Sequence, residues 1–228
     1  MPPEEILTVF LVIPAGGKGL RMGGGVPKQF RPWRGRPLLK ATVEAFFGPG
    51  MPALAGVVLA VPADYVTEVQ AWPLPVPAWV VAGGATRQDS VAAALAALPE
   101  EPGAAVLIHD AVRPFPPAGP IREALEALAE WDGAVLGEAS TDTLKRVDPD
   151  GRIRETVPRE FIFRAQTPQA ARLGTWRRAF QAASRDGFQG TDDVALLERL
   201  AMKVRMVPSP ASNLKITAPA DWDRQAAD

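Results

Sequence analysis

The chain has 228 residues, of which 47% are hydrophobic and 22% are charged, and its formal net charge is −1. These are ordinary values for a globular protein with a substantial core, and the balanced charge argues against a general nucleic-acid binder. The absence of cysteine and the presence of one histidine exclude disulfides, thiolate catalysis, cysteine-ligated zinc and polyhistidine metal sites. The first residues lack a basic signal-peptide region, and no apolar run approaches the length of a membrane span, so we expect a cytoplasmic protein.

The first predicted element is a buried strand over Ile6–Ile13, which runs directly into a glycine-rich loop. From Ala15 to Arg36 there are six Lys or Arg residues and no Asp or Glu. Glycines let backbone N–H groups approach an anion closely. Lys18, Arg21 and Lys28 add positive charge within reach of that anion. The segment therefore predicts a loop that holds a polyphosphate.

Two common glycine-rich motifs do not match this loop. A Walker P-loop requires Gly-Lys followed by Ser or Thr, but Gly17-Lys18 is followed by Gly19. The dinucleotide fingerprint Gly-x-Gly-x-x-Gly starts at Gly17, but its third glycine is replaced by Met22. The remaining alternative is a flexible surface loop with incidental charges.

The next part of the chain alternates short apolar runs with amphipathic segments. We expect strands at Gly56–Val61, Ala78–Val81, Ala105–His109 and Gly133–Leu136. We expect helices at Pro37–Phe47, Asp64–Trp72, Arg87–Leu98 and Pro120–Trp131, with Pro37 and Pro120 in first turns and Asp64 as an N-cap. This alternation predicts an α/β fold with a doubly wound, mostly parallel Rossmann-like sheet. Ligands of such sheets bind beyond the carboxyl ends of the strands.

Regular alternation stops after Gly137. Residues 138–163 contain two alternating stretches around a turn at Asp148–Gly151, which predicts a β-hairpin arm with too few apolar residues to form a core. Such an extension is more often an oligomerisation arm than an independent domain. The α/β pattern then resumes, with helices expected at Ala170–Ser184 and Asp192–Leu200, a strand at Lys203–Val207 and a last helix from Pro219.

The segment Ala82–Val91 contains a double glycine between a strand and a helix. Its backbone groups around Gly84, together with the Ser90 hydroxyl, are suited to reading a nucleotide base. A routine strand-to-helix turn explains the same residues equally well.

Asp110 follows the predicted strand at Ala105–His109. A carboxylate at the carboxyl end of a parallel strand, beside a basic phosphate loop, is well placed for a Mg²⁺ ion that bridges phosphates. The alternative is a helix cap or an ion pair between Asp110 and Arg113. We expect His109 to pack in the interior rather than to catalyse.

Weaker signals follow near the carboxyl end. Thr191 and Asp192 are typical of a capped helix start. Lys215 lies between Leu214 and Ile216, where a structural lysine has little reason to be, although a solvated edge strand also explains it.

Taken together and in order, these segments resemble the 2-C-methyl-D-erythritol 4-phosphate cytidylyltransferases. The resemblance runs essentially end to end and is carried by Pro-Ala-Gly-Gly-x-Gly-x-Arg-Met…Pro-Lys-Gln, Gly-Gly-x-x-Arg-x-Asp-Ser-Val, His-Asp-Ala-x-Arg-Pro, Asp-Thr-Leu-Lys, Thr-Pro-Gln, Thr-Asp-Asp and Asn-Leu-Lys-Ile-Thr. The chain departs from the family at Gly16, where a second alanine is usual, which should loosen the loop without removing a contact. It also departs at Ala85, where some members carry Asp.

The resemblance implies transfer of CMP from CTP to 2-C-methyl-D-erythritol 4-phosphate, with Mg²⁺, by one nucleotidyltransferase domain over residues 1–228. It also implies a homodimer whose hairpin arms complete each other's sites. Neither a membrane nor a nucleic acid is expected as a partner. The open alternatives are a ribitol-5-phosphate cytidylyltransferase and a module that binds CTP without turnover.

The resemblance also assigns residue roles. It makes Arg21 and Lys28 catalytic, through stabilisation of the transition state, and Asp110 the metal ligand. It assigns substrate positioning to Arg159, Lys215, Arg113, Thr143, Thr167 and Thr191. It assigns nucleotide binding to Ala15, Gly16, Gly17, Gly19, Gly84, Arg87, Ser90, Asp110 and Ala111.

Overall fold

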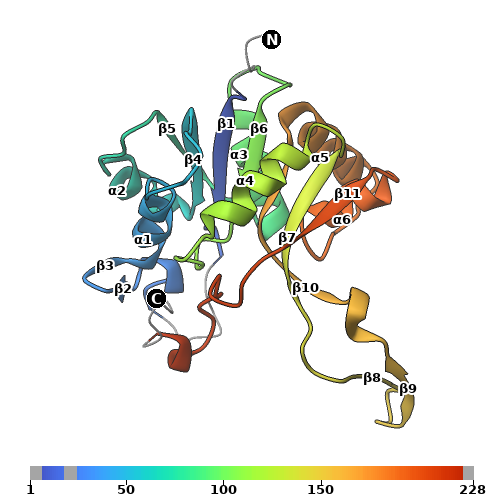
Figure 1. The fold of residues 1–228 in the computed structure, drawn as a ribbon. Helices are drawn as coiled ribbons and strands as arrows, with labels where there is room; N and C mark the ends of the chain where they lie inside the picture. The colour runs from blue at the N-terminus through green and yellow to red at the C-terminus, as the bar shows by residue number, and fades with distance from the viewer. Residues whose placement is uncertain (1–6, 18–24, 223–228) are drawn as a thin grey trace.

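The computed structural model describes residues 7–17 and 25–222, whose strands form a seven-stranded sheet and two small two-stranded sheets (Figure 1). The order of the large sheet is β11-β7-β10-β6-β1-β4-β5. Its strands are β1 (Val9–Pro14), β4 (Gly56–Val61), β5 (Ala78–Ala82), β6 (Ala105–Ile108), β7 (Gly133–Ala139), β10 (Phe163–Arg172) and β11 (Val204–Pro208). β10 runs antiparallel to both of its neighbours, and the other pairs are parallel. The expected doubly wound, mostly parallel sheet is thereby confirmed.

Helices cover both faces of this sheet, because its central strands are apolar on both sides. In β1, Leu11 and Ile13 pack into one core and Phe10 and Val12 into the other. The first core contains residues of α1 (Leu38–Ala45), α2 (Val66–Gln70) and α4 (Ala118–Ala127). The second contains residues of α3 (Arg87–Ala97), α5 (Leu173–Arg185) and α6 (Val194–Arg199). Leu11 is fully buried, and burial of a side chain of this size contributes about 1.5–3 kcal/mol.

The start of the expected helix over Ala170–Ser184 is wrong. Residues 170–172 belong to β10, and helix α5 begins at Leu173. β10 enters the sheet between β6 and β7, and its residues Gln166–Ala171 are buried. This strand is hard to recognise in the sequence because its buried stretch includes the polar residues Gln166, Thr167 and Gln169, whose side chains are hydrogen-bonded in the fold.

The hairpin arm over residues 138–163 is present, with its turn at the expected place. β8 (Leu144–Val147) pairs antiparallel with β9 (Ile153–Val157) in a sheet of its own. Asp148 and Gly151 close the turn through a backbone hydrogen bond of 2.9 Å. Figure 1 shows the arm extending beyond the main sheet. The ends of the segment belong to that sheet instead, since β7 continues to Ala139 and β10 starts at Phe163.

Some helix boundaries also differ from expectation. Asp64 does not cap a helix: it lies within a 3-10 helix, Ala63–Tyr65, and the N-cap of α2 is Tyr65. Pro37 is the N-cap of α1 and ends the small hairpin of β2 (Pro32–Trp33) and β3 (Arg36–Pro37), whereas Pro120 lies in the first turn of α4 as expected. Further 3-10 helices lie at Lys28–Phe30, Arg159–Phe161 and Pro219–Asp221. Within the described part of the chain, no helix has both the length and the apolar character needed to cross a membrane.

Candidate active site

A cavity of about 550 Å³ lies at the carboxyl ends of β1 and β6, the edge where ligands of doubly wound sheets bind. Nine of the residues expected at the site line it: Ala15, Gly16, Gly17, Gly84, Arg87, Ser90, Asp110, Ala111 and Lys215. A larger cavity of about 810 Å³ lies near the starts of β1 and β6, and none of the expected residues lines it. We therefore take the 550 Å³ cavity as the candidate active site.

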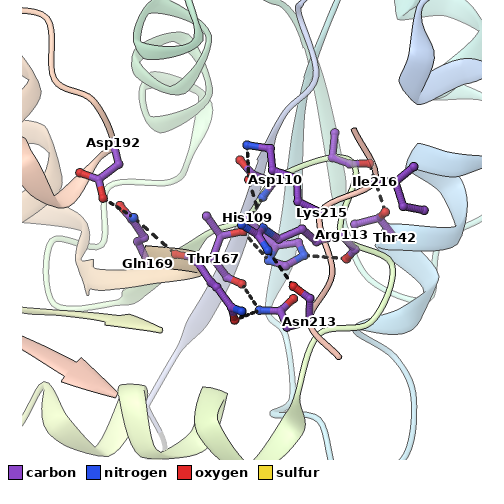
Figure 2. Close-up of polar contacts among 12 residues, drawn as sticks. Thr42, His109, Asp110, Arg113, Thr167, Gln169, Asp192, Asn213, Lys215 and Ile216 are labelled. Carbon is purple, nitrogen blue, oxygen red and sulfur yellow. Dashed lines mark hydrogen bonds and ion pairs between the residues drawn. The ribbon is translucent and has the colours of Figure 1, made fainter. Parts of the chain in front are cut away.

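Asp110 forms the charged centre of this cavity. Its Oδ2 lies 2.9 Å from Nζ of Lys215 and 3.2 Å from Nε of Arg113, and its Oδ1 lies 3.4 Å from Nε of Arg87. Figure 2 shows Lys215, Arg113 and Asp110 converging from different parts of the chain. Burial alone would raise the pKa of Asp110, but the three cations outweigh it and hold that pKa well below its usual range. Asp110 is therefore ionised, and the ion pair with Arg113 that was the alternative to a metal site is present. A metal contact by Asp110 stays a prediction.

The side chain of Gln29 holds the start of the glycine loop in place through hydrogen bonds. The Gln29 side chain is buried, and its Nε2 donates hydrogen bonds to the carbonyl oxygens of Ala15 (2.5 Å) and Gly17 (2.9 Å). The backbone N–H of Ala15 donates to Ala60 of β4 at 2.7 Å. These bonds fix the start of the loop at the cavity wall. Lys18, Gly19 and Arg21 lie outside the described residues.

Gly16 and Gly83 bring two loops into direct contact at this wall. A Cβ atom built on Gly16 would lie 2.7 Å from Oγ of Ser90 and 3.2 Å from Cα of Gly83. The missing side chain at position 16 permits this close approach. The expected loosening of the loop stays a prediction.

The turn after β5 is shaped by its own side chains. Ser90 Oγ donates to the Thr86 carbonyl at 2.9 Å and accepts from the Gly84 N–H at 3.1 Å. Thr86 and Asp89 form a reciprocal capping box at the start of α3. Gly84, Thr86 and Ser90 thus form the strand-to-helix turn that was the alternative to base reading, and they also line the cavity. A base contact by Ser90 stays a prediction.

Lys28 reaches the same region from the N-terminal part of the chain. Its Nζ donates to the carbonyl oxygen of Ile216 at 2.7 Å, next to Lys215. The backbone N–H of Ile216 donates to the Val112 carbonyl at 2.9 Å. The fold therefore brings together two lysines that are 187 positions apart in the sequence.

His109 is fully buried behind the cavity, as expected for a packing residue. Burial lowers its pKa to about 4, so the ring is neutral at neutral pH. Its Nε2 lies 2.9 Å from the Arg113 carbonyl and therefore carries the proton, which leaves Nδ1 to accept from the Thr167 hydroxyl at 3.1 Å. Thr167 Oγ1 in turn accepts from the Asp110 N–H at 3.0 Å. Thr167 thus fixes the backbone at Asp110, and its expected contact with substrate stays a prediction.

Six of the expected site residues that the structure describes do not line this cavity in the single chain. Lys28, Arg113 and Thr167 lie beside it through the contacts given above, and the other three are exposed. Arg159 is exposed at the base of the arm and donates to the Thr141 carbonyl. Thr143 is exposed on the arm, and Thr191 is exposed before α6. Asp192 precedes the N-cap of α6, Asp193, and its Oδ1 accepts from the Ala195 N–H in the first turn at 3.0 Å.

Two side chains that received no role from the sequence hold the charged centre. The Nδ2 atom of Asn213 donates to Gln166 Oε1 and to the Thr167 backbone carbonyl, both at 2.8 Å. The backbone carbonyl of Asn213 accepts from Arg113 at 2.7 Å. Asp193 is buried and forms a bidentate ion pair with Arg87, with both contacts at 2.8 Å. Both residues belong to motifs that carry the resemblance, and that was the only sequence signal for them.

The fold and the cavity define a Rossmann-like α/β protein with a cavity lined by glycines and by Arg87, Asp110 and Lys215 at the carboxyl ends of its strands. The model of the 2-C-methyl-D-erythritol 4-phosphate cytidylyltransferase family matches residues 9–227. The chain belongs to this family.

Named relatives agree along nearly the whole chain. The 2-C-methyl-D-erythritol 4-phosphate cytidylyltransferase of Acidobacterium capsulatum is 40% identical, with 96% of each chain covered. That of Symbiobacterium thermophilum is 41% identical, over 95% of this chain and 90% of the relative. The crystal structure of the enzyme of the same name from Thermus thermophilus superposes with a TM-score of 0.75 at 34% identity, covering 95% of this chain and 96% of that one. The Francisella tularensis structure gives a TM-score of 0.80 at 26% identity, covering 95% and 97%.

Proposed function

We propose that the protein transfers CMP from CTP to 2-C-methyl-D-erythritol 4-phosphate, releasing pyrophosphate. Family membership over residues 9–227 and the names of relatives about 40% identical support this substrate pair. The observation that carries the proposal is the cluster of Arg87, Arg113 and Lys215 around Asp110 in the wall of the glycine-lined cavity. A site that joins two phosphate compounds needs such fixed positive charge.

The chemistry requires no general base. This suits the cavity, because the single histidine of the chain, His109, is buried and neutral. The acceptor phosphate is already an anion at neutral pH. One of its oxygens attacks the α-phosphorus of CTP in line, and the bond from that phosphorus to the bridging oxygen breaks as pyrophosphate leaves. We assign stabilisation of the charge that spreads over the phosphate oxygens to Lys28, and the resemblance adds Arg21. Lys215, which contacts Asp110, would position the attacking phosphate.

We propose Mg²⁺ as the cofactor, with Asp110 as its protein ligand. Among residues 7–17 and 25–222, no group of three or more His, Asp or Glu side chains forms a metal site. One carboxylate fits Mg²⁺, because this ion usually binds through one or two carboxylates together with substrate phosphates and water. Oδ1 of Asp110 is the less engaged oxygen, with its Arg87 contact at 3.4 Å, and it would hold the ion. When bound, the ion supplies further positive charge to the phosphates.

We propose that the protein acts as a homodimer joined through the arm. Val147, Ile153 and Phe161 are exposed by 53%, 60% and 85%, and they lie on an arm whose hairpin strands pair only with each other in the described structure. A two-fold pairing of arms would cover these side chains. It would also offer Arg159 and Thr143, which lie away from the cavity of their own chain, to the site of the partner.

One assay separates this function from its alternatives. Pyrophosphate release from CTP is measured with 2-C-methyl-D-erythritol 4-phosphate, with ribitol 5-phosphate and without an acceptor. The proposal expects release that depends on the first acceptor. Faster turnover of ribitol 5-phosphate would indicate the related pentitol enzyme, and CTP binding without release would indicate a non-catalytic module.

A further inference from the structure

Arg87 joins two carboxylates rather than facing the cavity freely. It is the first residue of α3, and its two terminal nitrogens contact Asp193 at 2.8 Å each, while Nε faces Oδ1 of Asp110 at 3.4 Å. Burial alone would lower the pKa of Arg87, but the charges of Asp193 and Asp110 outweigh it and hold that pKa above its ordinary value. The guanidinium is therefore always charged and is oriented by its partners.

Asp193 is itself fixed by the antiparallel strand β10. The Oε1 atom of Gln169 accepts from the N–H groups of Asp193 (3.0 Å) and Val194 (2.9 Å), and its Nε2 donates to Asp192 at 2.9 Å. Figure 2 shows Gln169 reaching Asp192 on the side away from Lys215. Gln169 pairs with Ile108 at the end of β6, two residues before Asp110. The distance between Asp193 and Asp110 is thus set by the sheet.

We propose that Asp193 is a positioning residue for the nucleotide site, which holds the terminal edge of Arg87 and thereby limits Arg87 to one long contact, 3.4 Å from Nε, with Oδ1 of Asp110, so that this oxygen can still take a ligand cation. An arginine prefers to bind a carboxylate through two parallel hydrogen bonds. Without Asp193, the freed edge of Arg87 would turn onto Asp110 and occupy the oxygen that we assign to Mg²⁺. This inference rests on the proposed function and on its magnesium site.

The test is CTP binding, measured by calorimetry with Mg²⁺ and with EDTA. Asp193→Asn keeps the shape of the side chain and removes its charge. We expect it to weaken CTP binding in Mg²⁺ about 10- to 100-fold, the usual effect of losing a partner of a metal ligand, and to weaken binding in EDTA much less. The matched control is Asp186→Asn, which removes a carboxylate that pairs with Arg185 and Arg199 and contacts neither Arg87 nor Gln169, and it should bind CTP like the wild type in both buffers.

A second variant keeps the test decisive if Asp193→Asn does not fold. Arg87→Met combined with Asp193→Asn removes both charges together, which buried pairs tolerate better than the loss of one. Because the Arg87 guanidinium is then absent and cannot turn onto Oδ1 of Asp110, this double variant should still bind CTP more tightly with Mg²⁺ than with EDTA.

Two results would overturn the inference. One is a folded Asp193→Asn protein whose affinity for CTP falls equally in both buffers or not at all. The other is a double variant for which Mg²⁺ adds nothing. A wild-type protein that fails to bind CTP would instead contradict the proposed function, whatever the variants do.

Discussion

The ammonium group of Lys28 donates a hydrogen bond of 2.7 Å to the carbonyl oxygen of Ile216. This contact ties the segment after the glycine loop to the segment that carries Lys215, which itself contacts Asp110 at 2.9 Å. Positive charge from both ends of the chain is thereby fixed beside the cavity before any ligand binds, and preorganised charge is what stabilises a phosphoryl-transfer transition state.

Lys28→Ala should lower kcat at least about 100-fold while CTP still binds, because this charge acts mainly on the transition state. Arg21→Ala should have the same effect, because the family resemblance gives Arg21 the same role as Lys28. Steady-state kinetics and CTP calorimetry measure the two effects separately. Lys40→Ala is the control, since the Lys40 ammonium lies over the ring of Trp72, whereas that of Lys28 contacts the segment that carries Lys215. A Lys28→Ala enzyme with near wild-type kcat would show that the assignment is wrong.

Asp110→Asn should raise the Mg²⁺ concentration needed for half-maximal rate, and weaken nucleotide binding, by about tenfold or more. The substitution removes the carboxylate that three cations surround and that we assign to the metal. Initial rates over a magnesium titration test it, with the exposed Asp64→Asn as control. An unchanged titration would mean that Asp110 serves only to orient its basic neighbours.

His109 should make the protein less stable as the pH falls from 7 to 5. Its pKa is about 4 in the folded state against an ordinary 6.5, so below pH 6.5 the unfolded chain takes up a proton that the folded chain does not. Stability from this group is complete above about pH 6.5 and is lost as the pH falls towards 4; between pH 7 and 5 the loss is about 2 kcal/mol. Urea unfolding of the metal-free protein measures it.

The chain has a single histidine, so the His109→Gln variant isolates this effect. Its free energy of unfolding should change much less between pH 7 and pH 5 than that of the wild type. If wild type and variant show the same slope, the histidine is not held neutral by the fold.

Gly16→Ala should destabilise the protein by about 1 kcal/mol and weaken CTP binding, because the new Cβ would overpack the contact with Gly83 and displace the Ser90 hydroxyl from its turn. Thermal unfolding and CTP calorimetry measure both effects. Gly103→Ala is a matched control, since Gly103 does not line the cavity and a Cβ at that position meets no described atom within 4 Å. Equal behaviour of the two variants would contradict the steric explanation.

Replacing Thr141–Thr156 by a short glycine linker should produce a monomer that binds CTP but has lost acceptor turnover. The deletion removes β8 and most of β9, which pair with each other and leave Val147 and Ile153 exposed. Light scattering, CTP calorimetry and pyrophosphate release test the three parts of this expectation. A deletion variant that remains dimeric would place the interface elsewhere.

A mixing experiment extends this test of the arm to Arg159. Arg159→Ala subunits are mixed with Lys28→Ala subunits to form heterodimers. If Arg159 acts across the dimer, one of the two sites in each heterodimer contains both wild-type side chains, and part of the activity returns. Pyrophosphate release from heterodimers verified by mass spectrometry is the measurement. No recovery would assign Arg159 to the site of its own subunit.

The sequence by itself determined the alternation of strands and helices and the composition of the glycine loop. β4 spans Gly56–Val61 as predicted, because a short apolar run rich in Val suits a strand that is buried on both faces. The placement of Asp110 just beyond the end of β6 follows from the same rule, since a buried parallel strand of apolar residues ends before the first charge appears.

Only the tertiary structure decided how the polar residues were used. β10 contains Gln169, whose polar side chain suggests the surface, yet the strand is buried because that side chain hydrogen-bonds Asp193 and Asp192 in another part of the chain. Lys28 with Ile216, and Arg87 with Asp193, are likewise contacts between segments more than a hundred residues apart. Hydrophobic periodicity is a local signal and reports burial, whereas hydrogen bonds and ion pairs depend on which segments the packed sheet brings together.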